Sequence, residues 1–164
     1  MEQAVRFCTA PDGVRIAWSS IGHGPPVVKT AHWMTHLEHD LRSPVWRPWV
    51  EAFSAGHRLV RYDQRGSGLS DRTAERFDLE AHLADLSAVV DDAGLDRFAF
   101  LGLSQGAALA IRYAVLHPER VTCLVLCGGY ARGWRRRGAA DLARNELLQE
   151  VIRVGWDSDD AVFR

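Results

Sequence analysis

The sequence predicts an α/β protein: a doubly wound, mostly parallel sheet that begins with an antiparallel hairpin. Two early apolar runs, 5–9 and 14–20, are joined by Pro11-Asp12-Gly13, a turn typical of a hairpin. From residue 27 onward, short apolar runs alternate with stretches of helical periodicity. Strands that alternate with helices are expected to be joined by right-handed crossovers into a parallel sheet.

In the first half of the chain, each further element follows from its local pattern. The expected elements are a first interior strand at 27–31, a loop at 32–40, a helix at 45–55 and a strand at 58–62. The helix is expected because its apolar side chains fall on one side. Pro48 is tolerated there because it lies in the first turn.

The clearest helix begins after Asp78, which can cap it, and is stopped by Gly94. Between them, apolar residues repeat at helical spacing. A strand at 98–103, a helix at 105–117 and a strand at 121–127 complete the expected sheet. The last strand is continuously apolar, which is typical of a strand buried on both faces of a parallel sheet.

The end of the chain has a different pattern. Residues 128–133 read as a flexible connector, 141–154 predict a helix, and the acidic run at 157–160 can cap another helix from Ala161. Arg135, Arg136 and Arg137 are interpreted as a solvated hinge, because acidic residues follow them closely. We therefore expect two domains, a core of residues 1–129 and a second domain of residues 130–164.

The composition is that of an ordinary globular protein, with 47% hydrophobic and 25% charged residues. A formal net charge of −1 gives no reason to expect nucleic acid or a membrane surface as a partner. No apolar run is long enough to span a bilayer, and the N-terminus shows no secretion signal. The three cysteines do not form a disulfide framework, which favours a reduced, cytoplasmic setting.

A strand pattern runs into Gly102-Leu103-Ser104-Gln105-Gly106 and then directly into a helical pattern. This is the context of a sharp turn that exposes a nucleophilic serine hydroxyl. Side chains at Gly102 and Gly106 would collide with the following helix, which accounts for both glycines. The turn would aim the Gln105 amide at an oxygen bound near Ser104. We favour this over a glycine-bearing turn with an incidental serine.

A second motif, Asp63-Gln64-Arg65-Gly66-Ser67-Gly68-Leu69-Ser70, follows the expected strand at 58–62. We interpret it as structural: its glycines permit positive φ, while Asp63 and Arg65 can bond local backbone and lock the loop. Asp-x-Arg-Gly-x-Gly-x-Ser upstream of Gly-x-Ser-x-Gly resembles the N-terminal part of the α/β-hydrolase fold superfamily. The resemblance implies that the sheet is truncated after its sixth strand and that residues 130–164 begin a helical lid.

The resemblance also implies a function. The parent protein would be a serine hydrolase acting on an ester, lactone, amide or similar small acyl substrate, without cofactor or metal. Ser104 would be the nucleophile, and the amides of Gln105 and Trp33 would hold the oxyanion. Here Ala31-His32-Trp33 departs from the family's pattern, because His32 replaces a glycine and puts the shape of this loop in doubt. We expect His32 near Ser104, in a hydrogen-bonded or pocket-lining role.

The family's catalytic acid and histidine have no counterpart in these residues. The last histidine, His117, would lie about 18 Å from Ser104 at the far end of its helix, which is too far for a general base. We therefore expect an N-terminal fragment that is itself inactive and self-associates through an exposed sheet edge. A natural short protein that has lost catalysis remains the structural alternative.

Two other functions have some support in the sequence. Residues 34–40 contain histidines and carboxylates, but their spacing matches no metal site. The altered loop at Ala31-His32-Trp33 and the run from Cys8 to Gly13 also look like hydrolase-fold modules of bacterial regulators or cyclases. Such a module would sense a small ligand without turning it over, and this alternative to the hydrolase stays open.

Overall fold

The computed structural model describes residues 3–130 and 132–155. The chain divides into two compact units, residues 1–129 and residues 130–164. The first unit holds the sheet and the helices that pack on it, and the second holds a helix and a single short 3-10 turn among its described residues.

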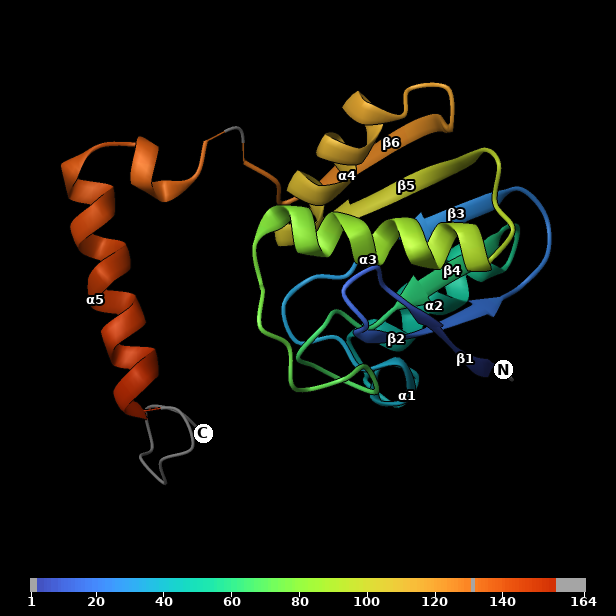
Figure 1. Ribbon diagram of the computed structural model, residues 1–164, viewed down its shortest axis with the longest axis horizontal. Coiled ribbons are helices and arrows are strands. Elements are labelled where there is room, and N and C mark those ends of the chain that lie inside the picture. Colours follow the sequence, from blue (N-terminus) through green and yellow to red (C-terminus); the bar gives the residue numbers. More distant parts are fainter. Residues whose placement is uncertain (1–2, 131, 156–164) are drawn as a thin grey trace. The chain divides into compact units, whose positions relative to one another are not determined.

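The described part of the first unit contains a six-stranded sheet (Figure 1). Its strands are β1 (Ala4–Thr9), β2 (Arg15–Ile21), β3 (Pro26–Lys29), β4 (Arg58–Tyr62), β5 (Phe98–Leu103) and β6 (Val121–Cys127). Across the sheet the order is β1-β2-β4-β3-β5-β6. β1 pairs antiparallel with β2, and β2 with β4, whereas β4, β3, β5 and β6 run parallel. The predicted hairpin and mostly parallel sheet are confirmed.

Helices lie on both faces of this sheet. They are α1 (Leu37–Asp40), α2 (Trp46–Ser54), α3 (Leu79–Asp92) and α4 (Gln105–Leu116). Figure 1 shows α3 and α4 on one face and α2 on the other. α3 has the expected ends: the Asp78 carboxylate accepts the Ala81 N–H at 3.0 Å, and Gly94 takes φ 65°. The loop expected at 32–40 contains one helical turn, α1.

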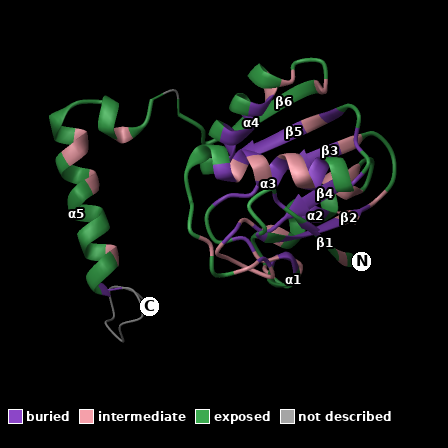
Figure 2. Ribbon diagram, viewed as in Figure 1, coloured by how far each residue is buried: buried purple, intermediate pink, exposed green. Residues whose placement is uncertain are grey.

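Two apolar clusters form the core, one on each face of the sheet. Figure 2 shows that the buried residues run along the inner strands. The α3 and α4 side buries side chains that include Trp18, Val60 and Phe100. The α2 side buries a smaller set that includes Leu59 and Leu101. Because successive side chains of a strand point to opposite faces, β4 and β5 contribute to both clusters.

β6 does not match its expected burial. Val121 is half-buried and every other residue of the strand is exposed, with Val125 46% exposed. The prediction of a strand buried on both faces is wrong, because β6 is the outermost strand and pairs only with β5 among the described residues. The unpaired edge predicted for this strand is present.

In the second unit, a short 3-10 turn at Trp134–Arg136 precedes α5 (Ala139–Gly155), which confirms the helix predicted at 141–154. The helix expected from Ala161 and its capping residues lie outside the described residues. Across residues 3–130 and 132–155, none of the helices has the length and apolar character needed to cross a bilayer.

Candidate active site

Ser104 occupies the turn between β5 and α4 in a backbone conformation that side chains rarely adopt. Its φ is 51° and its ψ −120°, and the residue is exposed. Its N–H donates to the Cys127 carbonyl at 2.9 Å, and its carbonyl accepts the Ala107 N–H at 3.1 Å. Such strain in a non-glycine residue persists only where the surrounding structure holds it. β5, the turn at Ser104 and α4 follow one another as the sequence predicted.

The two flanking glycines leave no room for side chains. A Cβ at Gly102 would lie 2.9 Å from the Ala107 Cα in the first turn of α4, as expected. A Cβ at Gly106 would lie 2.8 Å from the Ala31 carbonyl oxygen and would also meet Thr30 Oγ1. Gly106 thus packs against the loop that follows β3, whereas the sequence predicted a collision with the helix after Ser104. The sharp turn at Ser104 (residues 102–106) and the loop after β3 are therefore in direct contact.

The loop after β3 carries the other predicted oxyanion residue, Trp33, whose side chain is 55% exposed. His32 beside it is buried, and its Nδ1 lies 3.0 Å from the Trp33 carbonyl oxygen. Because a carbonyl only accepts, Nδ1 carries the proton. Burial, with the nearby Lys29 charge, lowers the pKa of His32 below its ordinary value. His32 is thus neutral, and the hydrogen bond from its Nδ1 to the Trp33 carbonyl stabilises this loop.

His32 Nε2 is buried and has no hydrogen-bond partner within the described residues. Its ring lies against Trp46 of α2, with the ring centres 4.5 Å apart. These contacts place the ring between its own loop and α2. The next residue but one, Met34, also has a positive φ of 57°, so the loop bends sharply after the tryptophan.

The loop after β4 is held by two buried charged residues. Asp63 accepts the N–H groups of Leu69 at 2.9 Å and Leu37 at 3.2 Å, and so ties its own loop to α1. Burial raises the pKa of this carboxyl above its ordinary value. Its role as a local lock matches the interpretation of the motif.

Arg65 bonds the backbone of its own loop, as predicted, because its Nη1 donates to the Arg76 carbonyl at 3.0 Å. Its other bonds reach carboxylates outside that loop. It makes two bonds to Asp85 of α3, at 2.8 and 2.7 Å, and two to Asp12 in the hairpin turn, at 2.7 and 3.2 Å. The carboxylate of Asp85 raises the pKa of Arg65 above its usual range. Guanidinium groups favour such paired bonds to carboxylates. Arg65 therefore ties the loop to two distant elements.

Gln105 links the turn at Ser104 to the loop after β4. Its side-chain Nε2 donates to Gln64 Oε1 at 3.1 Å, and the Gln64 N–H donates to Thr35 Oγ1 at 3.3 Å. Gln64 thus connects the loops that follow β3 and β4 with the start of α4. Sequence reasoning missed Gln64, because it treated the motif that contains it as structural.

A small cavity of about 40 Å³ lies beside Gln105. It is lined by Ala31, Tyr62, Gln64, Leu79, His82, Gln105 and Leu109. The structure therefore places the predicted Gln105 at a hollow formed by the carboxyl ends of parallel strands, where ligands of open α/β sheets bind.

The remaining histidines supply no further centre in the part of the chain that the structure describes. His117 follows the last turn of α4, at the opposite end of the helix from Ser104. Over the described ranges, no three His, Cys, Asp or Glu side chains gather as metal ligands would.

Comparisons with known proteins find hydrolases. A protein of Escherichia coli O81 named as a carbamate hydrolase, RutD, is 33% identical over 119 residues, which make up 72% of this chain and 45% of that protein. Epoxide hydrolase A of Mycobacterium tuberculosis is 33% identical over 117 residues, 69% of this chain and 35% of that protein.

The solved structure of Est816, described as an N-acyl homoserine lactone degrading enzyme, superposes with a TM-score of 0.65 at 28% identity. The match covers 76% of this chain and 45% of that one. This chain thus spans less than half the length of the curated relatives named above. The sequence profile of the alpha/beta hydrolase fold matches residues 38–150, most of the chain. The chain belongs to the alpha/beta hydrolase fold family.

Proposed function

We propose that this chain carries the nucleophile and the oxyanion site of a serine hydrolase that acts on an ester, lactone, amide or similar small acyl substrate. The supporting observation is Ser104 itself. It is an exposed serine at positive φ between a central strand and a helix, with no room for side chains two residues to either side. A nucleophile elbow requires this backbone.

In this proposal the Ser104 Oγ attacks the acyl carbon, and the carbonyl electron pair moves onto oxygen. The amide of Gln105 stabilises that oxyanion, because the first N–H groups of a helix have no partner within it. The amide of Trp33 is the second donor. A histidine from outside the 164 residues takes the serine proton and passes it to the leaving group.

The elbow residue also bears on the substrate class. Carbamates and lactones, the compounds in the names of two relatives, both offer an acyl carbon to a hydroxyl nucleophile. An epoxide, as in the name of the third, does not. A serine that opened an epoxide would form an ether, which water cannot readily cleave, whereas a carboxylate forms a hydrolysable ester. Ser104 therefore favours acyl substrates.

A fluorophosphonate probe tests this proposal on the longest natural form of the protein that contains these residues. We expect the probe to label the protein, with Ser104 Oγ displacing fluoride from phosphorus, and Ser104→Ala to abolish the labelling. Ser87→Ala is the matched control, because Ser87 lies on α3 and its hydroxyl donates to the Leu83 carbonyl at 3.0 Å.

Labelling that survives in Ser104→Ala would exclude Ser104 as the nucleophile. If a folded protein fails to label at all, the non-catalytic ligand-sensing module is favoured instead. Direct binding of acyl compounds without turnover would then identify that module.

A further inference from the structure

Lys29 is the single lysine of the chain, whose other basic residues are all arginine. It is the last residue of β3 and only 5% exposed. Lysine is among the residues least often buried, because its charged form loses hydration inside a protein. A buried lysine with no catalytic role assigned to it therefore needs an explanation.

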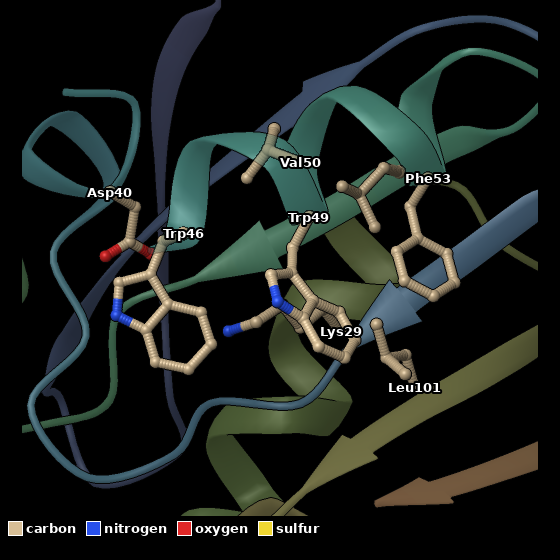
Figure 3. A pocket seen from close by; sticks show the side chains of 8 residues that line it. Lys29, Asp40, Trp46, Trp49, Val50, Phe53 and Leu101 are labelled. Carbon is tan, nitrogen blue, oxygen red and sulfur yellow. The ribbon is translucent and has the colours of Figure 1, made fainter. Parts of the chain in front are cut away.

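The side chain of Lys29 borders a small cavity beneath α2 (Figure 3). The other lining residues are Asp40, Trp46, Trp49, Val50, Phe53, Leu59 and Leu101. We call this group the Lys29 niche; Ser104 is not part of it. In Figure 3 the Lys29 nitrogen lies between the two tryptophan side chains. The cavity volume is about 10 Å³, room for one water-sized molecule.

The amine of Lys29 has no close counterion. Its Nζ lies 5.4 Å from the centre of the Trp46 ring, and it makes no hydrogen bond or ion pair with the described residues. Asp40 is the nearby carboxylate, but its Oδ2 accepts from Arg61 Nη1 at 3.2 Å. Arg61 is also the residue directly opposite Lys29 on β4. The amine therefore faces an aromatic ring and the cavity.

This environment disfavours the charged amine, so the neutral fraction at a given pH is larger than for an exposed lysine. The pKa of Lys29 is lowered to about 8, mainly by burial and in part by the Arg61 charge, against the opposing effect of Asp40 and Asp63. Lysines that are desolvated in an apolar pocket, or placed next to another cation, become nucleophiles toward carbonyl compounds. Both conditions hold at Lys29.

We propose that Lys29 is a covalent capture site for a small aldehyde, which the niche holds as an imine. The neutral amine attacks the aldehyde carbon, and a new C–N bond forms as the carbonyl oxygen takes up a proton. The nitrogen then loses its remaining proton, the hydroxyl leaves as water, and a C=N bond results. Amine and aldehyde give imine and water, with no oxidant or reductant.

The niche sets the size of the aldehyde. Its cavity holds about one water-sized group, so the single carbon that formaldehyde leaves on the nitrogen fits, whereas larger carbonyl compounds must displace a side chain. Trp49, one of its walls, is 39% exposed, so the niche lies just below the surface of α2. A bulkier aldehyde would have to move the side chains of this helix.

Formaldehyde with cyanoborohydride tests the proposal on the full chain, because the reductant traps an imine as a stable methylamine. Peptide mass mapping then gives the rate of methylation at Lys29 near neutral pH. We expect this rate to be about tenfold or more higher in the folded chain than in guanidinium chloride, where the lysine recovers its ordinary pKa. A folded rate equal to or below the unfolded rate would show that burial only shields Lys29.

Two variants sharpen the test. Lys29→Arg removes the primary amine, so methylation must disappear from this peptide. Val50→Ala enlarges the niche by truncating one wall, and it should raise the rate with isobutyraldehyde more than the rate with formaldehyde. Equal acceleration of both aldehydes, or none in a folded variant, would contradict capture within the niche. Neither variant alters Ser104, so these results do not depend on the serine hydrolase proposal.

Discussion

Lys29 and Arg61 lie opposite each other on neighbouring parallel strands, and both are buried. Like charges directly opposite one another destabilise a sheet. Asp40 from α1 forms an ion pair with Arg61 at 3.2 Å and offsets the charge of Lys29 only in part. The charged form of Lys29 is therefore a cost to the folded state, and that cost must depend on pH.

We expect Lys29→Met to stabilise the protein at neutral pH, by an amount that falls as the pH rises. The folded pKa of Lys29 is about 8, below its ordinary value of 10.5. Well below pH 8, Lys29 is protonated in the folded and in the unfolded protein, and the full free-energy cost of burying its charge is present. Between these two values the unfolded chain binds more protons, so the stability of the unaltered protein rises with pH.

The difference between the folded and unfolded pKa values of Lys29 corresponds to about 3 kcal/mol of unfolding free energy. Chemical unfolding of both proteins from pH 7 to pH 11 measures it. Titration of Cys8, whose pKa burial raises to about 11, occurs in both proteins and cancels in the comparison. A difference in stability that stays constant with pH would contradict a lowered pKa at Lys29.

At the scale of elements, Arg65 joins three segments that lie far apart in the sequence. Its side chain is fully buried and bridges the loop after β4, helix α3 and the β1–β2 hairpin turn. Removing one partner of a buried ion pair leaves the other charged and unpaired, which is more costly than losing an exposed pair.

We therefore expect Arg65→Met to lower the free energy of unfolding by about 3 to 5 kcal/mol, because Asp85 would remain buried without its partner. Arg47→Met is the matched control: its partner Glu51 is exposed and one helical turn away, so little change is expected. Urea unfolding of both variants measures the difference. Equal effects of the two substitutions would show that the Arg65 bridge adds nothing beyond a surface ion pair.

The features that the sequence predicted correctly depend on neighbouring residues. Asp78 and Gly94 delimit α3 through local backbone chemistry, and the turn at Ser104 depends on two glycines only two residues away. Such signals are complete within a short window of sequence. The helix ends and the elbow were predictable for this reason.

Other features depend on contacts between residues that lie far apart in the sequence. Gln105 bonds Gln64 across 41 residues, and Arg65 reaches Asp12 across 53. The exposure of β6 likewise follows from its place at the edge of the sheet, not from its apolar composition. Long-range pairs and strand neighbours are properties of the tertiary structure, so composition and periodicity could not supply them.

At the scale of the whole molecule, the edge of the sheet at β6 is an exposed apolar strand. Leu124, Val125 and Leu126 are each more than a third exposed. Beside them is an apolar groove of about 410 Å³, which Val125 also lines together with Val27 and Phe100. An open, apolar edge strand is a template for pairing with another chain.

We propose that isolated copies of this chain associate through β6, and we expect their mass in sedimentation velocity experiments to rise with concentration. Val125→Lys should shift the protein toward monomer, because a lysine on an edge strand opposes edge-to-edge pairing. Val115→Lys is the matched control, since Val115 is 68% exposed on α4 and lies off this edge. A chain that stays monomeric at every concentration, or two lysine variants that act alike, would refute association through β6.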